Sequence, residues 1–230
     1  MVLQDRKTST LADMPGPDKR VFLLLQGPHG PFFDRLGKLL RRAGAEVWRC
    51  AFNAGDEFFW SDPAHLLRHT GSSAEWPAHL ARIVADKQVT DIVLYGDVRP
   101  IHAAARQASQ DRGLRLHVFE EGYLRPYWIS YERGGSNGHS VLLDISLAEM
   151  QATLHQTLAE VRRPPAHWGD MRQHKAYGAL YHFLVLTRNG RYRNFASHRA
   201  LPVLDEFRLN LRRFLLMPVH SATCLVQWRH

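Results

Sequence analysis

Residues 21–53 read VFLLLQGPHGPFFDRLGKLLRRAGAEVWRCAFN, and this stretch decides the fold. It opens with VFLLLQG, a short and continuously apolar run typical of a strand covered on both faces of a sheet. The next segment, FFDRLGKLLRRAG, places Phe32, Leu36, Leu39 and Leu40 on one helical face, and Gly44 follows as a stop signal. AEVWRCAFN reads as a second strand. The stretch therefore predicts a strand–helix–strand unit.

The same alternation continues to residue 121. We expect a loop at GDEFFWSDP, a helix over 73–87, a strand at TDIVLYGD, a helix at RPIHAAARQASQDRG and a strand at LRLHVFEE. Strands separated by helices of this length predict an α/β fold with a doubly wound parallel sheet. The expected domain organisation is a flexible tail over 1–18, the α/β domain over 19–145, and a basic helical segment or connector over 146–230.

Composition narrows the class of protein. The chain has 230 residues, 45% of them hydrophobic and 23% charged, as in ordinary globular proteins. Cys50 and Cys224 match no metal or redox spacing. No apolar run is long enough to span a bilayer, so we expect a cytoplasmic protein.

Positive charge is concentrated at the C-terminal end. From Val161 onward there are twelve Lys and Arg against three acids, a net charge of +9 in a chain whose total is +8. Such asymmetry indicates either contact with phosphates or an anionic surface, or simply a solvated basic face. Binding to nucleic acid is disfavoured because these charges lie among aromatic and apolar residues and no nucleic-acid motif is present.

In open α/β sheets, ligands bind beyond the carboxyl ends of the strands. The first such end is QGPHGP. Gly27 and Gly30 allow a tight turn there, and the same loop is able to present backbone N–H groups to a phosphate, with His29 nearby.

The second end is GDVRPIH. Asp97 is expected either to cap the helix that begins near Pro100 or to handle protons, together with His102. Arg99 is a candidate ligand for a carboxylate or phosphate.

The third end is EEGYLRP. Glu120 and Glu121 are adjacent on a strand and so point to opposite faces, which means that one partner such as Arg125 cannot satisfy both. At least one is expected to face a ligand, beside Asp97 if the two strands are neighbours. Tyr123 belongs either to the core or to this site. The loop GGSNG that follows is either an ordinary surface loop or one that closes on a ligand through Asn137.

Several of these strings carry a resemblance. QGPHGPFF, YGDVRPIH, VFEEGYLRPYWIS with GGSNGHS, WGDMRQHKAYGALYHFLV and NFASHRALPVLDEFRLNLRRFLLMPVH resemble the capsule polysaccharide biosynthesis and export family of Gram-negative bacteria, over about residues 20–220. Within it, the chain is most similar to single-domain β-Kdo transferases that start the oligo-Kdo linker.

The resemblance implies a GT-B-type glycosyltransferase with two Rossmann-like halves, of which this chain resembles the N-terminal one. It implies a CMP-Kdo donor, a phosphatidylglycerol or lysophosphatidylglycerol acceptor, retention at the anomeric centre through a carboxylate nucleophile, and no cofactor or essential metal. Glu121, Asp97 and Glu120 are the candidates for that nucleophile or base. The candidate substrate-binding residues are Arg99, His102, Arg125, Tyr123, His29, Gly27, Gly30 and Asn137.

The basic C-terminal helices are expected either to touch anionic lipid or to connect the two halves. The first reading adds peripheral contact with the inner membrane and with a capsule assembly complex. No second set of alternating strands follows Met217, so the sequence predicts a missing second half. The alternative function is therefore an inactive half-domain or an accessory protein in capsule assembly or export.

Overall fold

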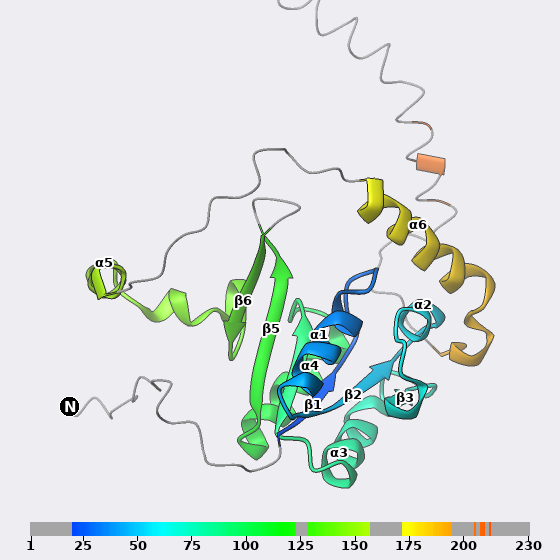
Figure 1. Cartoon of the computed structure of the whole chain (residues 1–230), viewed down its shortest axis with the longest axis horizontal. Coiled ribbons are helices and arrows are strands. Elements are labelled where there is room, and N and C mark those ends of the chain that lie inside the picture. Colours follow the sequence, from blue (N-terminus) through cyan, green and yellow to red (C-terminus); the bar gives the residue numbers. More distant parts are fainter. Residues whose placement is uncertain are drawn as a thin grey trace, which may run out of the picture.

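The protein folds around one six-stranded sheet, as seen in a computed structural model (Figure 1). The structure describes residues 20–122, 128–156 and 172–194, together with residues 205, 208, 209 and 212. The strands are β1 (Val21–Leu24), β2 (Glu46–Ala51), β3 (Leu66–Arg68), β4 (Asp91–Tyr95), β5 (Arg115–Glu121) and β6 (Ile129–Arg133). The helices are α1 (Phe32–Arg42), α2 (Ala54–Phe58), α3 (Trp76–Asp86), α4 (Pro100–Arg112), α5 (Leu147–Gln156) and α6 (Arg172–Thr187), with 3-10 turns at Pro63–His65, Asn137–His139, Val141–Asp144 and Asn189–Tyr192.

The strand order is β3-β2-β1-β4-β5-β6, and β1 to β5 run parallel. This confirms the predicted doubly wound parallel sheet with Rossmann-like topology. The chain starts in the middle at β1, builds outward to β3 and then crosses to β4, so the strand order reverses between β1 and β4. The carboxyl ends of these two strands mark the place where such folds bind ligands.

Sequence reasoning missed three elements. α2 begins at Ala54 and continues into the predicted loop GDEFFWSDP as far as Phe58. β3 has only three residues and lies at one edge of the sheet. β6 pairs with β5 in the antiparallel direction and closes the other edge.

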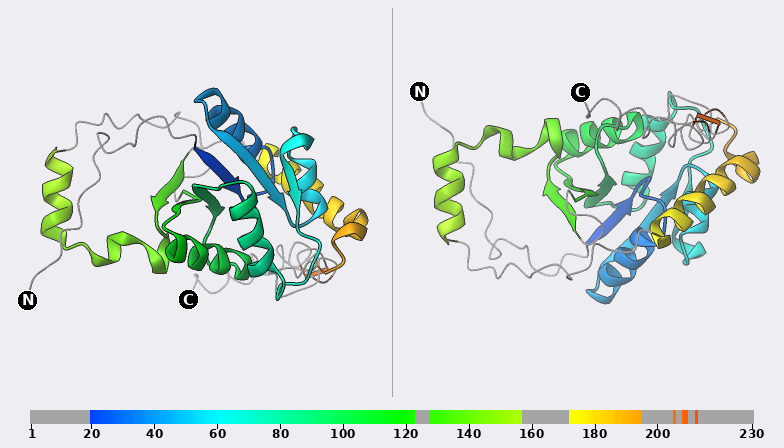
Figure 2. Two further views of the ribbon diagram at one scale, coloured as in Figure 1. Left: turned by 90° about the horizontal axis from the view of Figure 1, so that it is seen from below. Right: turned by 90° about the horizontal axis from the view of Figure 1, so that it is seen from above.

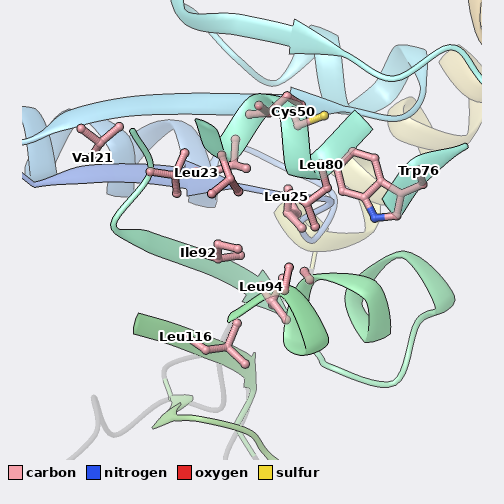
Figure 3. Packing of buried hydrophobic residues seen from close by; sticks show 14 of the residues in the cluster. Val21, Leu23, Leu25, Cys50, Trp76, Leu80, Ile92, Leu94 and Leu116 are labelled. Atoms are coloured by element: carbon pink, nitrogen blue, oxygen red, sulfur yellow. The ribbon is translucent and has the colours of Figure 1, made fainter. Parts of the chain in front are cut away.

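The inner strands β1, β2 and β4 bury side chains on both faces of the sheet. Leu23 and Ile92 pack with α3 and α4 on one face, in the cluster drawn in Figure 3, which includes Trp76 and Leu80. Phe33 of α1 packs on the other face with the partly buried Leu36 and Leu40 of the same helix. Helices on both faces explain why the VFLLL run is continuously apolar rather than alternating.

Asp91, at the start of β4, forms a network of polar contacts at the amino edge of the sheet. This fully buried carboxylate forms ion pairs with Arg20 and with Arg115 at 3.3 Å, and His117 Nε2 lies within hydrogen-bond distance, at 2.8 Å. Burial acts to raise the pKa of Asp91, but the hydrogen bonds from His117 and Arg20 outweigh it and lower that pKa. The amino edge is therefore held by a satisfied ion-pair network.

α6 lies against the body of the domain next to α2, whereas α5 stands apart from the sheet in all views (Figure 2). The α6 residue Tyr181 packs so closely on α2 that a Cβ added at Gly55 would lie 2.4 Å from its ring. The stretch before and within α5 exposes large apolar side chains, namely Val141, Leu142, Leu143, Ile145, Leu147 and Leu154. Among the described helices, none is long and apolar enough to cross a membrane.

Candidate functional site

The carboxyl ends of β4 and β5 are joined by the loop over 134–140. Asp97, two residues beyond β4, is fully buried, and its Oδ2 accepts a hydrogen bond from the Ser136 backbone N–H at 2.9 Å. The His139 Nδ1 lies 3.1 Å from the same oxygen. The Asn137 side chain donates to Glu120 Oε2 at 2.5 Å. The GGSNGHS loop therefore folds onto two of the predicted acids, Asp97 and Glu120.

This arrangement corrects one expectation for Asp97. The N-cap of α4 is Arg99, and no side chain makes a capping hydrogen bond there. Asp97 does not cap the helix because its carboxylate is engaged by the loop over 134–140 instead. Its Oδ1 is buried and has no hydrogen-bond partner within the described part of the chain.

Glu120 and Glu121 reach different partners, as the alternation of side chains along a strand predicts. Glu120 bonds Asn137, whereas Glu121 Oε1 lies 3.9 Å from Nε2 of His174 on α6. Both glutamates are partly exposed. Of the three predicted acids, these two are the ones that solvent reaches.

The loop after β1 meets α6. Nε2 of His29 lies 3.0 Å from Nε2 of His174. Gly30 has a φ of +101°, and a Cβ there would lie 2.9 Å from the Tyr177 ring. A Cβ at Gly27 would lie 2.6 Å from the Phe33 ring. Both glycines thus permit close packing, while phosphate binding by this loop stays a prediction.

Arg99 and His102 come from the start of α4. The Arg99 guanidinium is directed to the Gln26 carbonyl oxygen, with Nη1 at 3.5 Å. His102 is fully buried and its Nδ1–H donates to the Gly96 carbonyl at 2.6 Å. Burial, reinforced by Arg99, lowers the pKa of His102 to about 3, so the ring is neutral. His102 therefore holds the turn after β4, and its direct contact with a substrate stays a prediction.

A buried polar cluster that the sequence analysis did not single out lies beside Arg99. Arg49 of β2 forms an ion pair with Asp56 at 3.1 Å, and Asn53 donates to the same carboxylate at 3.1 Å. Asn53 also donates to the Tyr181 hydroxyl of α6 at 2.7 Å. A charged residue in the centre of an apolar strand, as Arg49 is in EVWRCA, was the signal that could have found it.

Burial shifts the pKa of each charged group in this cluster. It lowers the pKa of Arg49 and of Arg99 and raises the pKa of Asp56. Burial likewise raises the pKa of Tyr181, so its hydroxyl stays neutral. The cluster is therefore a desolvated charged site and not a solvated surface.

Two predicted residues, Tyr123 and Arg125, lie outside the described residues, and their roles stay predictions. In the part of the chain that the structure describes, no group of three or more His, Cys, Asp or Glu side chains is arranged to hold a metal ion. The site thus consists of acids, buried or partly buried arginines, and histidines at the carboxyl edge of a Rossmann-like sheet.

A Rossmann-like α/β protein with its polar residues at the strand reversal belongs to a broad class of ligand-binding folds. The family model described as "Capsule polysaccharide biosynthesis protein" matches residues 90–224, more than half of the chain. The chain belongs to this family.

Curated relatives agree with that assignment. The chain is 34% identical over 184 residues to the capsule polysaccharide modification protein LipB of Neisseria meningitidis serogroup B, which covers 77% of this chain and 43% of that protein. It is 37% identical over 121 residues to the capsule polysaccharide export protein KpsS of Escherichia coli, which covers 53% of this chain and 31% of that protein. The chain thus spans less than half the length of these relatives.

Among solved structures, the Bordetella bronchiseptica enzyme WbmH in complex with NAD+ matches 42% of this chain and 36% of its own chain. The TM-score is 0.33 and the sequence identity is 20%. This likeness is too slight to bear on fold or function.

Proposed function

We propose that this chain forms the N-terminal Rossmann-like half of a retaining GT-B glycosyltransferase of capsule assembly. In this proposal it transfers Kdo from CMP-Kdo to a phosphatidylglycerol or lysophosphatidylglycerol acceptor. Membership of the capsule polysaccharide biosynthesis family supports the process, and the residues at the carboxyl edge support the chemistry.

The observation that carries the proposal is the joining of two strand ends by one loop. Asp97 beyond β4 and Glu120 at the end of β5 are linked through Ser136 and Asn137. Glu121 lies beside them with its side chain partly exposed. A retaining transfer through a covalent intermediate requires a carboxylate that reaches the anomeric carbon, and Glu121 or Glu120 meets that requirement more directly than the buried Asp97.

The leaving group supports the same assignment of roles. CMP leaves as a phosphate monoester, which needs little protonation, so the site does not require a strong general acid. It requires positive charge near the donor, and Arg99 lies close to the strand reversal to provide it. A sugar acid such as Kdo also needs a cation for its carboxylate, and a planar guanidinium suits that purpose.

A transfer assay tests the proposal. The purified chain is mixed with CMP-Kdo generated in place and a short-chain phosphatidylglycerol acceptor, and the product is identified by mass. We expect a product heavier than the acceptor by one Kdo. A folded chain that yields no such product, even when supplied with the C-terminal part of a longer relative, would contradict the proposal and favour an accessory role.

Arg99 gives a second test within the same assay. Arg99→Ala removes a cation at the strand reversal, so we expect KM for the donor to rise about tenfold while KM for the acceptor changes by less than twofold. Arg115→Ala, on the amino edge, is the control. Equal changes in the two KM values would remove Arg99 from the donor site.

A further inference from the structure

A buried guanidinium, Arg49, and a partly buried one, Arg99, lie near one carboxylate at the carboxyl edge of the sheet. Arg49 comes from β2, Arg99 from the N-cap of α4, and Asp56 from α2. Asp56 interacts electrostatically with both arginines. His102, a buried ring on which both arginines act, is neutral and adds no charge. These groups therefore carry one more positive than negative charge.

Asp56 is already fully engaged. Its Oδ1 accepts from Arg49 Nη2 at 3.1 Å, and the Tyr181 hydroxyl lies 3.4 Å from the same oxygen. Its Oδ2 accepts from the Phe52 backbone N–H and from the Asn53 side chain, both at 3.1 Å. A carboxylate has about four acceptor positions, so Asp56 has none left for Arg99.

Arg49 uses only part of its guanidinium. The residue is 3% exposed, its guanidinium lies 4.8 Å from the centre of the Phe33 ring, and only Nη2 reaches Asp56. Nε and Nη1 are buried and have no partner within the described residues. Nη1 is directed at the loop after β1, where a Cβ at Gly27 would lie 3.1 Å from it.

Arg99 approaches the same loop. Its Nη1 lies 3.5 Å from the Gln26 carbonyl oxygen, a long distance for a hydrogen bond. Within the described part of the chain it forms no ion pair, although burial lowers its pKa. The Gln26–Gly27 backbone thus lies next to two arginines whose charges are incompletely compensated.

We propose that Arg49 and Arg99 form a binding site for an oxyanion, a carboxylate or a phosphate, at the strand reversal between β1 and β4. Unsatisfied N–H groups of a buried guanidinium are costly, and an oxyanion satisfies them with strong charge-assisted hydrogen bonds. Asp56 holds Arg49 in place and competes with the ligand for it, while Tyr181 covers the site from α6. The identity of the ligand, a sugar acid or its nucleotide, rests on the proposed function.

Titration calorimetry on the full chain tests the site without any transfer reaction. The probes are inorganic phosphate, CMP, free Kdo and, as the neutral control, cytidine. We expect an oxyanion probe to bind and cytidine not to bind. Binding of phosphate and CMP assigns the site to a phosphate, and binding of Kdo alone assigns it to a carboxylate. No binding by any of the three anions would overturn the proposal.

Two variants with opposite expected effects on anion affinity make the test specific. Asp56→Asn removes the competing charge and keeps both guanidiniums, so affinity for the anion should rise about threefold to tenfold. Arg49→Met should lower the affinity more than tenfold. Arg115→Gln removes an arginine that is paired with Asp91 on the amino edge, and should leave the affinity unchanged. Circular dichroism checks the fold of each variant.

The outcomes separate this site from the proposed function. If Arg49→Met does not fold, Asp56→Asn still decides, because an affinity equal to or weaker than that of the wild-type chain contradicts the proposal. A chain that transfers Kdo equally well with either substitution loses this site and keeps the glycosyltransferase proposal. A chain that binds oxyanions as expected but never transfers Kdo keeps this site and loses the glycosyltransferase proposal.

Discussion

At the scale of single residues, two buried side chains shape the turn after β4. His102 donates a hydrogen bond to the Gly96 carbonyl, and Asp97 accepts one from the backbone of the loop over 134–140. Both were predicted to act on substrate, and both were found fully buried. Their position indicates that they set the geometry of the more exposed Glu120 and Glu121.

The pKa of His102 predicts a pH dependence of stability. It is lowered to about 3 in the folded chain, whereas an unfolded histidine titrates near 6.5. Between these values the unfolded state binds a proton that the folded state does not, so stability is complete above pH 6.5 and is lost as the pH falls toward 3. The loss attributable to His102 is about 2 kcal/mol between pH 6.5 and 5.

Urea denaturation at a series of pH values measures this effect. His102→Asn keeps a donor near the Gly96 carbonyl but cannot titrate, so its stability should fall less steeply below pH 6.5 than that of the wild-type chain. The difference between the two curves isolates His102 from other groups such as Asp91. Parallel curves for the two proteins would show that His102 does not titrate as described.

At the scale of elements, the predicted strands and the helices between them were confirmed because each has a strong apolar pattern. β6 was missed because its burial alternates on an exposed edge, and β3 because three residues give no pattern. The position of α6 was beyond sequence reasoning: Tyr181 and His174 lie in the string HKAYGALYH, but no local rule states which residues they contact. The Arg49–Asp56 pair likewise depends on long-range packing of α2 against β2.

The close contact between α2 and α6 gives a test at this scale. Gly55→Ala places a methyl group 2.4 Å from the Tyr181 ring, so α6 must shift away from α2. We expect a loss of stability of about 1–3 kcal/mol. Amide hydrogen exchange should also become faster in peptides from α6.

Gly190→Ala is the matched control, because a Cβ at that position meets no atom within 4 Å. Its exchange pattern should match that of the wild-type chain. Protection of α6 that is equal in wild-type and Gly55→Ala protein would show that α6 does not rest on α2 as described.

At the scale of the whole molecule, charged and apolar surfaces lie in different places. All of the net positive charge falls after residue 160, and α6, which belongs to that segment, packs on α2. Much of the candidate basic helix FRLNLRRFLL lies outside the described residues. The exposed apolar stretch over 141–154 carries Asp144 and Glu149 instead of basic residues.

Vesicle co-sedimentation distinguishes these surfaces. If the basic C-terminal segment contacts lipid, binding should be several-fold stronger to phosphatidylglycerol vesicles than to phosphatidylcholine vesicles. Salt at 0.5 M should weaken this binding, because the Debye length then falls to about 4 Å and screens the charges. Arg208→Gln combined with Arg212→Gln should reduce that preference. Equal binding to both vesicles would instead point to the apolar stretch over 141–154.

The central claim is that chemistry occurs at the acidic carboxyl edge of β4 and β5. The most direct test is the Kdo transfer assay on the wild-type chain and on Glu121→Gln, Glu120→Gln and Asp97→Asn, each checked for folding by circular dichroism. We predict that Glu121→Gln lowers kcat at least a hundredfold while leaving the unfolding midpoint within about 2 °C, whereas Asp97→Asn also lowers stability because it releases the loop over 134–140. Full turnover by a folded Glu121→Gln and a folded Glu120→Gln protein would contradict the account.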